Sequence, residues 1–293
     1  MNLRGLSART VRSYLGWASQ LGRHYPEQEL ADLSRAEVLD FFVHLQSDRK
    51  LAGSSVNQAL CALRCFYRDF LKRRWKVWNE VKIYREEPLP EVLTREEVSL
   101  LLDTFHNGLY RAYFTLVYQC GLRLSEALNV RPSDIQSQRL TIRVKGKGGK
   151  LREVPISPDL LMRLRVFWRF HRNPDWLFPA TGRGWKSSGR TRQQALHASS
   201  KPMSKASAWA AFKQAKTECG LFRKHPKMCI HTLRHSYATH LLEGGVHIRQ
   251  LSTYLGHTTL KPTLVYLHLT EVSDAQAREA LQTLVFPSDK KKP

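Results

Sequence analysis

The sequence predicts a mainly α-helical protein with one small β-hairpin or sheet, the α+β class, divided into an N-terminal helical domain and a larger C-terminal domain. Apolar residues recur at three- and four-residue steps through most of the chain, which is the period of a helix packed on one face. Residues 139–144 and 151–156 instead alternate apolar and polar side chains around a Gly-rich turn, as a β-hairpin does. With 293 residues, of which 42% are hydrophobic, the chain can form two domains with their own cores.

Residues 1–82 are expected to form the helical N-terminal domain. A first amphipathic helix covers 7–24, a second opens with a capping box between Ser34 and Glu37, and a third follows Gly53 and continues to residue 71. The next ten residues, I-Y-R-E-E-P-L-P-E-V at 83–92, are polar and contain two prolines, which oppose helix continuation. They are predicted to link the two domains.

Residues 93–272 are expected to form the second domain. Its first helix opens with a capping box between Thr94 and Glu97, residues 110–119 form a buried apolar helix, and Pro158 lies near the start of a helix over 157–175. The stretch 180–204 lacks periodicity and is predicted to be irregular. Residues 273–293 are predicted to be a terminal helix, over 273–284, and a basic tail.

The charge balance predicts a polyanionic partner. The 47 Lys and Arg residues outnumber the 25 acidic residues, giving a formal net charge of +22, and each phosphate that they neutralise would release counterions. Composition alone does not distinguish DNA, RNA and an anionic membrane surface. The sequence contains no apolar run long enough to span a bilayer and its first residues lack the apolar core of a signal peptide, so we expect a cytoplasmic protein.

Neither the cysteines nor the histidines predict a metal site. Five scattered cysteines form no paired framework, and Cys61 and Cys65, one helical turn apart, have no second ligand pair at zinc spacing. His231 and His235 have the spacing of a zinc-protease helix, but Thr232 stands where that motif requires Glu. Reduced thiols and an absence of bound metal are expected.

Residues 231–266 bring together side chains suited to a phosphodiester. A helix from 231 places His231 and Arg234 on one face, a short helix over 248–255 ends at a turn with His257, and Tyr266 follows on a third segment. Arg matches phosphate oxygens, His exchanges protons near neutral pH, and a Tyr hydroxyl can attack phosphorus. Each residue alone has an ordinary structural interpretation, whereas the combination indicates phosphoryl-transfer chemistry.

Five ordered motifs make the sequence resemble the tyrosine recombinases of the phage-integrase family. H-T-L-R-H at 231–235, L-G-H at 255–257 and T-L-V-Y-L-H at 263–268 match that family's boxes, and the intervals of 23 positions from Arg234 to His257 and nine from His257 to Tyr266 also agree. G-L-R-L-S-E at 121–126 resembles its first Arg box, and K-G-K-G-G-K at 145–150 resembles its lysine hairpin. The resemblance covers nearly the whole chain.

The resemblance implies a site-specific DNA recombinase with a core-binding domain that clamps DNA and a catalytic domain. Tyr266 would form a 3′-phosphotyrosyl intermediate and strands would exchange through a Holliday junction, without cofactor, metal or ATP. The implied catalytic roles are phosphate binding by Arg123 and Arg234, protonation of the leaving oxygen by Lys147, proton transfer at Tyr266 by His231, and a hydrogen bond to the phosphate from His257. Glu126, three residues after Arg123, is placed to orient its guanidinium.

The resemblance further implies double-stranded DNA with paired inverted binding sites as the partner, a homotetramer in the synapse, a monomer or dimer off DNA, and a nucleoid-associated location. Residues 176–230 carry 11 basic residues and one acidic residue, Glu218, so the segment 180–204 is a candidate DNA contact. The basic residues expected to contact DNA are Arg64, Arg68, Lys72, Arg73, Arg74, Lys145, Lys150, Arg183, Lys186, Arg190, Arg192 and Lys201.

Two alternative functions remain open at this point. A type IB topoisomerase would use similar chemistry without exchanging strands between partners, although the motif order and the N-terminal helical domain favour a recombinase. A catalytically inactive DNA-binding factor would share the fold, although all five motifs keep reactive residue types.

Overall fold

The computed structural model describes residues 5–83, 89–182 and 184–269, together with all side chains in these ranges except those of Lys147 and Lys186. The terminal helix and tail expected over 273–293 lie outside the described residues. The chain divides into two compact units, Met1–Pro88 and Leu89–Pro293. This division falls within the stretch 83–92 where the sequence predicts the linker.

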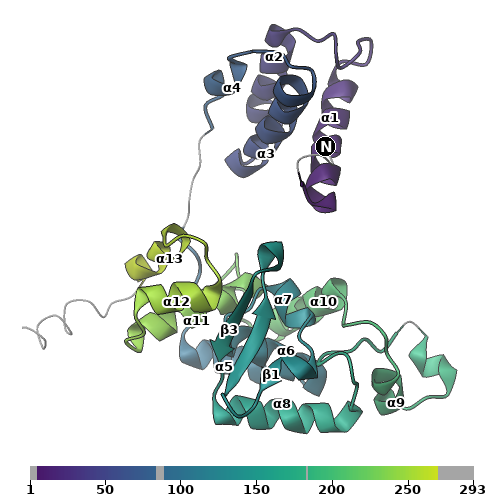
Figure 1. Cartoon of the computed structure of the whole chain (residues 1–293), viewed down its shortest axis with the longest axis vertical. Coiled ribbons are helices and arrows are strands. Elements are labelled where there is room, and N and C mark those ends of the chain that lie inside the picture. The colour runs from purple at the N-terminus through teal and green to yellow at the C-terminus, as the bar shows by residue number, and fades with distance from the viewer. Residues whose placement is uncertain (1–4, 84–88, 183, 270–293) are drawn as a thin grey trace, which may run out of the picture. The chain divides into compact units, whose positions relative to one another are not determined.

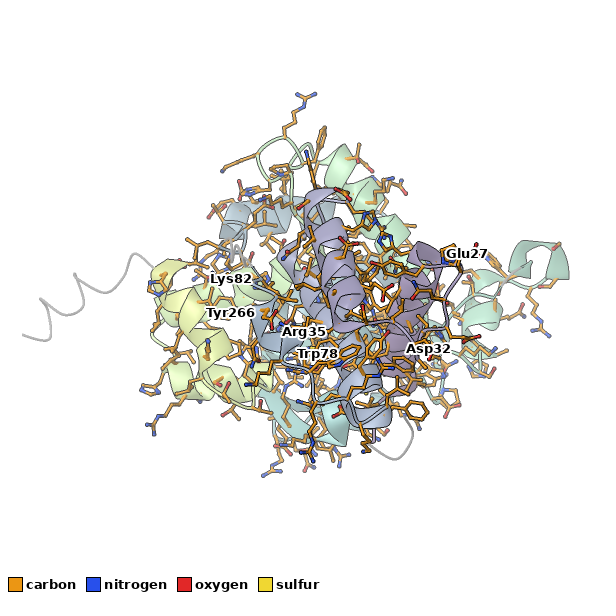
Figure 2. The ribbon with its side chains drawn as sticks, turned by 90° about the horizontal axis from the view of Figure 1, so that it is seen from above. Glu27, Asp32, Arg35, Trp78, Lys82 and Tyr266 are labelled. Atoms are coloured by element: carbon orange, nitrogen blue, oxygen red, sulfur yellow. The ribbon has the colours of Figure 1, made fainter. Side chains whose placement is uncertain are left out.

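The first unit is helical, as predicted (Figure 1). Its hydrophobic core contains large buried side chains, including Phe41, Phe42 and Tyr67. The predicted Ser34–Glu37 capping box is present at the start of the second helix. An ion pair between Arg35 and Glu80 joins that helix to the short one that carries Trp78 (Figure 2). The elements are α1 (Ala8–His24), α2 (Arg35–Ser47), α3 (Gly53–Arg64), the π-helical turn η2 (Cys65–Phe70) and α4 (Val77–Glu80).

Arg73 is half-buried and makes contacts inside this unit. Its guanidinium donates hydrogen bonds to the main-chain carbonyls of Leu33, at 2.9 Å, and Ala31. It also lies over the ring of Trp75, 4.9 Å from the centroid. The sequence shows a run of five residues, 72–76, with four positive charges. Only the fold shows that one of them, Arg73, binds the loop before α2.

The second unit packs helices around a small antiparallel sheet (Figure 1). The predicted Thr94–Glu97 capping box opens its first helix. The helices are α5 (Arg95–Asp103), α6 (Gly108–Gln119), α7 (Leu124–Leu128), α8 (Pro158–His171), α9 (Arg192–His197), α10 (Lys205–Glu218), α11 (Ile230–Glu243), α12 (Ile248–Leu255) and α13 (Lys261–Leu264). The single-turn 3-10 helices are η3 (Pro132–Asp134), η4 (Lys147–Gly149), η5 (Trp185–Ser188) and η6 (Val265–Leu269).

The sheet has the order β1 (Ile135–Gln136), β2 (Thr141–Lys145), β3 (Leu151–Pro155). The β2–β3 pair is the predicted hairpin, with Ile142 opposite Val154 and Val144 opposite Arg152. Ile142, Val144 and Val154 are buried against the helical core. The hairpin turns at η4, so the backbone of Lys147 lies at its tip.

The segment 180–204 has more structure than its lack of periodicity predicts. It contains η5 and α9, and α9 begins with a capping box between Thr191 and Gln194. The buried side-chain amide of Asn173 donates to three main-chain carbonyls after or within α9, and the amide of Ala180 donates to the carbonyl of Lys201 at 2.9 Å. Asn173 precedes a proline, which disfavours helix, and α8 ends two residues earlier than this position instead of reaching 175. The two ends of the segment are therefore tied to the domain.

No helix within the described ranges is long and apolar enough to cross a bilayer.

Candidate active site

Arg234 is the buried centre of the site. It lies on α11, whose buried face continues through most of the helix, and its side chain is only 4% exposed. One terminal nitrogen donates to the carbonyl of Gly121 and the other to the carbonyl of Leu255, both at 2.7 Å. Burial lowers the pKa of Arg234 to about 10, so the guanidinium stays charged at neutral pH. Two main-chain carbonyls thus hold the charged guanidinium of Arg234 in one orientation.

Gly121 permits this approach because no larger residue fits there. Its φ of +57° lies in the left-handed region, and a Cβ added to it would meet Cδ1 of Tyr237 at 2.3 Å. The chain then reaches Arg123, which precedes α7 and keeps part of its side chain exposed. One Nη of Arg123 also points to the carbonyl of Leu255, at 3.4 Å.

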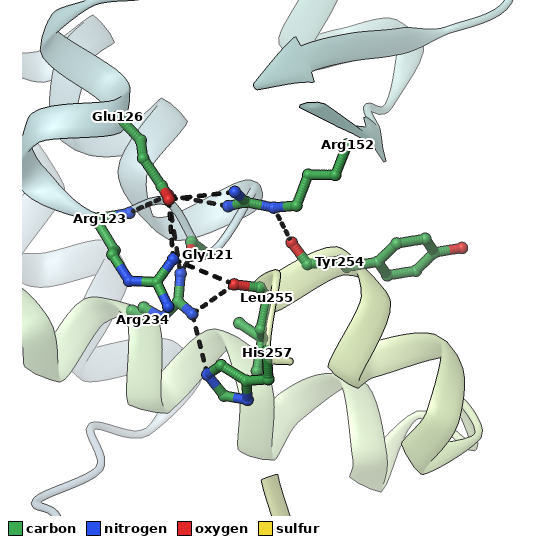
Figure 3. A network of polar contacts seen from close by, with 8 residues as sticks. All are labelled: Gly121, Arg123, Glu126, Arg152, Arg234, Tyr254, Leu255 and His257. Atoms are coloured by element: carbon green, nitrogen blue, oxygen red, sulfur yellow. Dashed lines mark hydrogen bonds and ion pairs between the residues drawn. The ribbon is translucent and has the colours of Figure 1, made fainter. Parts of the chain in front are cut away.

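Glu126 links the arginines of the site (Figure 3). Its carboxylate accepts the main-chain N–H of Arg123 at 2.9 Å and the guanidinium of Arg123 at 2.8 Å. It lies 3.9 Å from the guanidinium of Arg234. Burial acts to raise the pKa of Glu126, but hydrogen bonds from Arg152 and Arg123 outweigh it and lower this pKa to about 2. Glu126 is therefore ionised at neutral pH, as its predicted orienting role requires.

Arg152, which none of the sequence motifs indicates as a site residue, is the second partner of Glu126. From β3 it donates to both carboxylate oxygens, at 3.1 and 2.8 Å, and its Nε donates to the carbonyl of Tyr254 at 2.7 Å (Figure 3). Its side chain is 8% exposed. Three guanidinium groups then surround one carboxylate, which leaves a formal excess of two positive charges at the site.

His257 lies beside Arg234, as its motif predicts. Gly256 ends α12 with a φ of +64° and turns His257 back towards the site. Its Nε2 accepts a hydrogen bond from Arg234 at 3.1 Å, which places the ring proton on Nδ1, where it donates to Oγ1 of Thr263 at 2.8 Å. Burial and then the charge of Arg234 lower the pKa of His257 to about 4, so the ring is neutral at physiological pH.

Tyr266 is buried in η6, with 4% of its surface exposed. Its hydroxyl lies 3.0 Å from Nδ1 of His235, one residue after Arg234. Burial raises the pKa of Tyr266, and the charges of Arg234 and Arg123 partly oppose the increase. Burial, reinforced by neighbouring charges, lowers the pKa of His235 to about 4. A neutral His235 can accept a hydrogen bond from the Tyr266 hydroxyl through Nδ1 when its own proton is on Nε2.

His231 does not make this contact. It lies one turn before His235 on α11, with the two ring centroids 6.5 Å apart, and it is exposed. Desolvation of its enclosed part, then the charges of Arg234 and Arg123, hold the pKa of His231 below its usual value. Of the two histidines on this face, the structure brings the unpredicted one to the tyrosine.

Comparisons with known proteins agree with this geometry. The model of the "Phage integrase family" matches residues 91–272, and that of the "Phage integrase, N-terminal SAM-like domain" matches residues 1–77. The chain belongs to the phage integrase family. An "Integrase/recombinase" of Escherichia coli is 32% identical, covering 95% of this chain and 89% of that protein. "Tyrosine recombinase XerD" of Corynebacterium glutamicum is 31% identical, covering 91% and 90%.

Solved structures support the same fold. XerH recombinase in a post-cleavage complex with its palindromic difH substrate matches with a TM-score of 0.68 and 18% identity, over 96% of this chain and 81% of that one. A lambda integrase dimer bound to a COC′ core site matches with a TM-score of 0.68 and 16% identity, over 90% and 72%. The mainly helical fold with a small sheet is therefore that of the phage integrase family.

In this family member, five of the six predicted catalytic side chains are described. The structure brings Arg123, Arg234 and His257 together with Tyr266, and places His231 on the same helix face. The side chain of the sixth, Lys147, lies outside the described side chains, and its backbone is at the hairpin tip. Among the described residues no group of three or more His, Cys, Asp or Glu side chains could hold a metal ion.

The predicted DNA contacts of the first unit differ in their availability. Lys72 and Arg74 are exposed and Arg64 is half-buried. Arg68 is exposed and makes an ion pair with Asp69 at 2.9 Å. Arg73 is half-buried like Arg64, and its guanidinium also donates to main-chain carbonyls, so all five predicted residues keep some access to solvent.

The predicted DNA contacts of the second unit fall on two segments, the hairpin and 180–204. Arg192 is half-buried and donates a hydrogen bond to the side chain of Asn107. Arg183 and the side chain of Lys186 lie outside the described part of the chain. The predicted contacts whose side chains are exposed are Lys145, Lys150, Arg190 and Lys201.

Proposed function

We propose that this chain is a site-specific DNA recombinase that cuts and rejoins strands through a covalent bond between Tyr266 and a 3′-phosphate. The observation that carries the proposal is the buried Tyr266 hydroxyl in one site with the guanidinium groups of Arg234 and Arg123. A nucleophile and an oriented pair of cations suit a phosphodiester. The named relatives are recombinases, and two of the similar structures contain DNA.

The proposed chemistry conserves the energy of the DNA backbone. The Tyr266 oxygen attacks the scissile phosphorus, the bond from phosphorus to the 5′-oxygen breaks, and Lys147 gives that oxygen a proton. The 5′-hydroxyl of a partner strand then attacks the phosphotyrosine, and two such exchanges pass through a Holliday junction. Because the covalent ester replaces one phosphodiester by another, the cycle requires no ATP, and the guanidinium groups supply the positive charge that a metal ion could otherwise provide.

The arginine pair is proposed to bind the scissile phosphate. Arg234 is preorganised by its two carbonyl contacts and Arg123 by Glu126, so neither must reorganise as charge builds on the equatorial oxygens. His257 is neutral, and its Nδ1–H donates to Thr263 in the described structure. When DNA binds, this N–H would donate to a phosphate oxygen instead. Replacing either Arg123 or Arg234 by Ala is expected to slow cleavage by a factor on the order of a hundred.

The proton of Tyr266 has two candidate acceptors. The family resemblance assigns it to His231, whereas His235 holds the hydroxyl in the described structure. We propose that His235 orients the hydroxyl before DNA binds and that His231, which reaches the surface, receives the proton once the phosphate is in place. Replacing each in turn by Ala separates the roles, because loss of His231 alone should shift the pH dependence of cleavage.

The proposed assembly is a homotetramer on two DNA duplexes with paired inverted sites, formed from monomers or dimers. The proposed chemistry by itself requires several active sites in one complex, because two pairs of strands are exchanged. The expected location is the cytoplasm, associated with the nucleoid, because the +22 charge favours nucleic acid.

Trapping a covalent complex tests the proposed function. A DNA substrate nicked next to the scissile phosphate loses its 5′-end after cleavage, so the phosphotyrosyl complex accumulates and resists denaturation. Wild-type protein should form this complex and Tyr266→Phe should not, while binding DNA nearly as tightly, since one hydroxyl is removed. Absence of a complex with wild type would favour an inactive DNA-binding factor, and relaxation of supercoiled DNA without strand exchange would favour a topoisomerase.

A further inference from the structure

Arg152 touches three parts of the catalytic unit that the proposed reaction needs together. It lies on β3, five positions after Lys147, so its backbone belongs to the hairpin that carries the lysine. Its side chain leaves the sheet on the face opposite to that of the outward-pointing Glu153 and is 8% exposed. Unlike the exposed Lys145 and Lys150 of the same hairpin, Arg152 is not available to a DNA backbone.

The first link runs from Arg152 to the arginine pair. Each Glu126 oxygen accepts one hydrogen bond from the Arg152 guanidinium and one from Arg123, so the carboxylate is shared between the two residues (Figure 3). The same carboxylate lies 3.9 Å from Arg234. Two parallel hydrogen bonds between a planar guanidinium and a carboxylate fix their relative orientation, whereas a single hydrogen bond would allow rotation. The hairpin is thereby fastened to the group that orients Arg123.

The second link runs from Arg152 to the turn before His257. Nε of Arg152 donates to the carbonyl of Tyr254, and the next carbonyl, of Leu255, accepts from Arg234. A Cβ added to Gly256 would meet Cδ and Nη1 of Arg152 at 3.0 Å, so the guanidinium stem fills the space beside that glycine. Arg152 therefore contacts Tyr254 and Gly256, both within three residues of His257.

We infer that Arg152 is a positioning residue for strand transfer, which holds the Lys147 hairpin in register with the arginine pair and the His257 turn. The inference rests on the proposed function. Stability alone is a weaker account, because a buried ion pair adds little net free energy over an apolar substitute, whereas all three contacts of Arg152 go to groups that contact or precede phosphate-binding residues. A hairpin displaced by about 1 Å would carry the lysine away from the leaving oxygen at a large cost in rate.

The test uses a leaving group that needs no proton. Sulfur in place of the bridging 5′-oxygen leaves as a thiolate, whose conjugate acid has a pKa of about 8.5, so cleavage of such DNA bypasses the lysine. Full-length Arg152→Gln and Arg152→Lys are compared on ordinary and sulfur-bridged DNA; the second variant keeps the buried charge in case the first folds poorly. Arg143→Gln is the matched control, since Arg143 is an exposed arginine of β2.

Both Arg152 variants should cleave ordinary DNA roughly 10- to 100-fold more slowly than wild type and approach the wild-type rate on sulfur-bridged DNA, as Lys147→Ala should. Arg123→Ala should stay slow on both substrates, and Arg143→Gln should match wild type on both. Unchanged cleavage by the Arg152 variants, or a loss that sulfur does not restore, would overturn the inference. If wild type itself formed no covalent complex on either substrate, the proposed function would fail first.

Discussion

Replacing Glu126 by Gln should destabilise the second unit by a pH-dependent amount. The pKa of Glu126 falls from an ordinary 4.5 to about 2 in the fold, as bonds from Arg152 and Arg123 outweigh burial. A shift of that size corresponds to about 3 kcal/mol at pH 7, since each unit is worth about 1.4 kcal/mol. Gln keeps the shape but presents an N–H group to arginine donors, so most of this contribution should be lost.

The sign of the pH dependence follows from the direction of the shift. A depressed carboxyl pKa stabilises the fold above the unfolded value of 4.5, and this stabilisation is lost as the pH falls through the folded value. The difference between wild type and Glu126→Gln should therefore shrink from about 3 kcal/mol at pH 7 to about 1 kcal/mol at pH 3. Urea unfolding followed by hydrogen exchange in α6 and α11 measures it within this unit.

Glu153→Gln is the matched control on β3. Glu153 is exposed and lies 3.6 Å from Arg139, so its replacement should change the unfolding free energy by less than about 1 kcal/mol. Equal stabilities of the two variants at pH 7, or a difference that grows as the pH falls, would refute the account of Glu126 as the ionised centre of the arginine network.

Three further predictions concern packing, charge and assembly. Gly121→Ala should lower both stability and cleavage, because its Cβ would overlap Tyr237; a wild-type melting temperature would contradict this. Replacing the exposed Arg190 and Lys201 by Ala should reduce the slope of log affinity against log salt by about 0.9 per lost contact; an unchanged slope in a DNA-binding titration would leave 180–204 without a DNA role. The terminal helix expected over 273–284 is proposed to pack on a neighbouring protomer, so truncation before Ser273 should leave a DNA-binding monomer that synapses poorly. Unchanged synapsis on native gels would oppose this packing.

The features that could be predicted from the sequence depend on local patterns. Capping boxes at Ser34 and Thr94, the hairpin alternation and the helix that ends before Gly256 are each encoded within a few residues, and the structure contains all four. The five motifs add order and spacing, which indicated the family. The irregular prediction for 180–204 was incomplete because α9 is a six-residue helix held by the distant Asn173, which no periodicity reveals.

The missed residues depend on packing between distant segments. Arg152 alternates along β3 like any strand residue, and only the position of Glu126 on α7 gives its fork a buried partner. His235 shares a helix face with His231, so the choice between them depends on where η6 places Tyr266. The basic run at 72–76 likewise gives no sign that Arg73 donates to carbonyls of the loop before α2. A sequence pattern can indicate a charged residue, but its hydrogen-bond partner is known only from the fold.

The most direct test of the central claim identifies the atom that carries the DNA. After trapping on nicked substrate and digestion with nuclease and protease, mass spectrometry of the wild-type complex should find the residual nucleotide on the peptide that contains Tyr266, attached through its 3′-phosphate to the phenolic oxygen. A nucleotide on another residue, or linkage through a 5′-phosphate, would contradict the account.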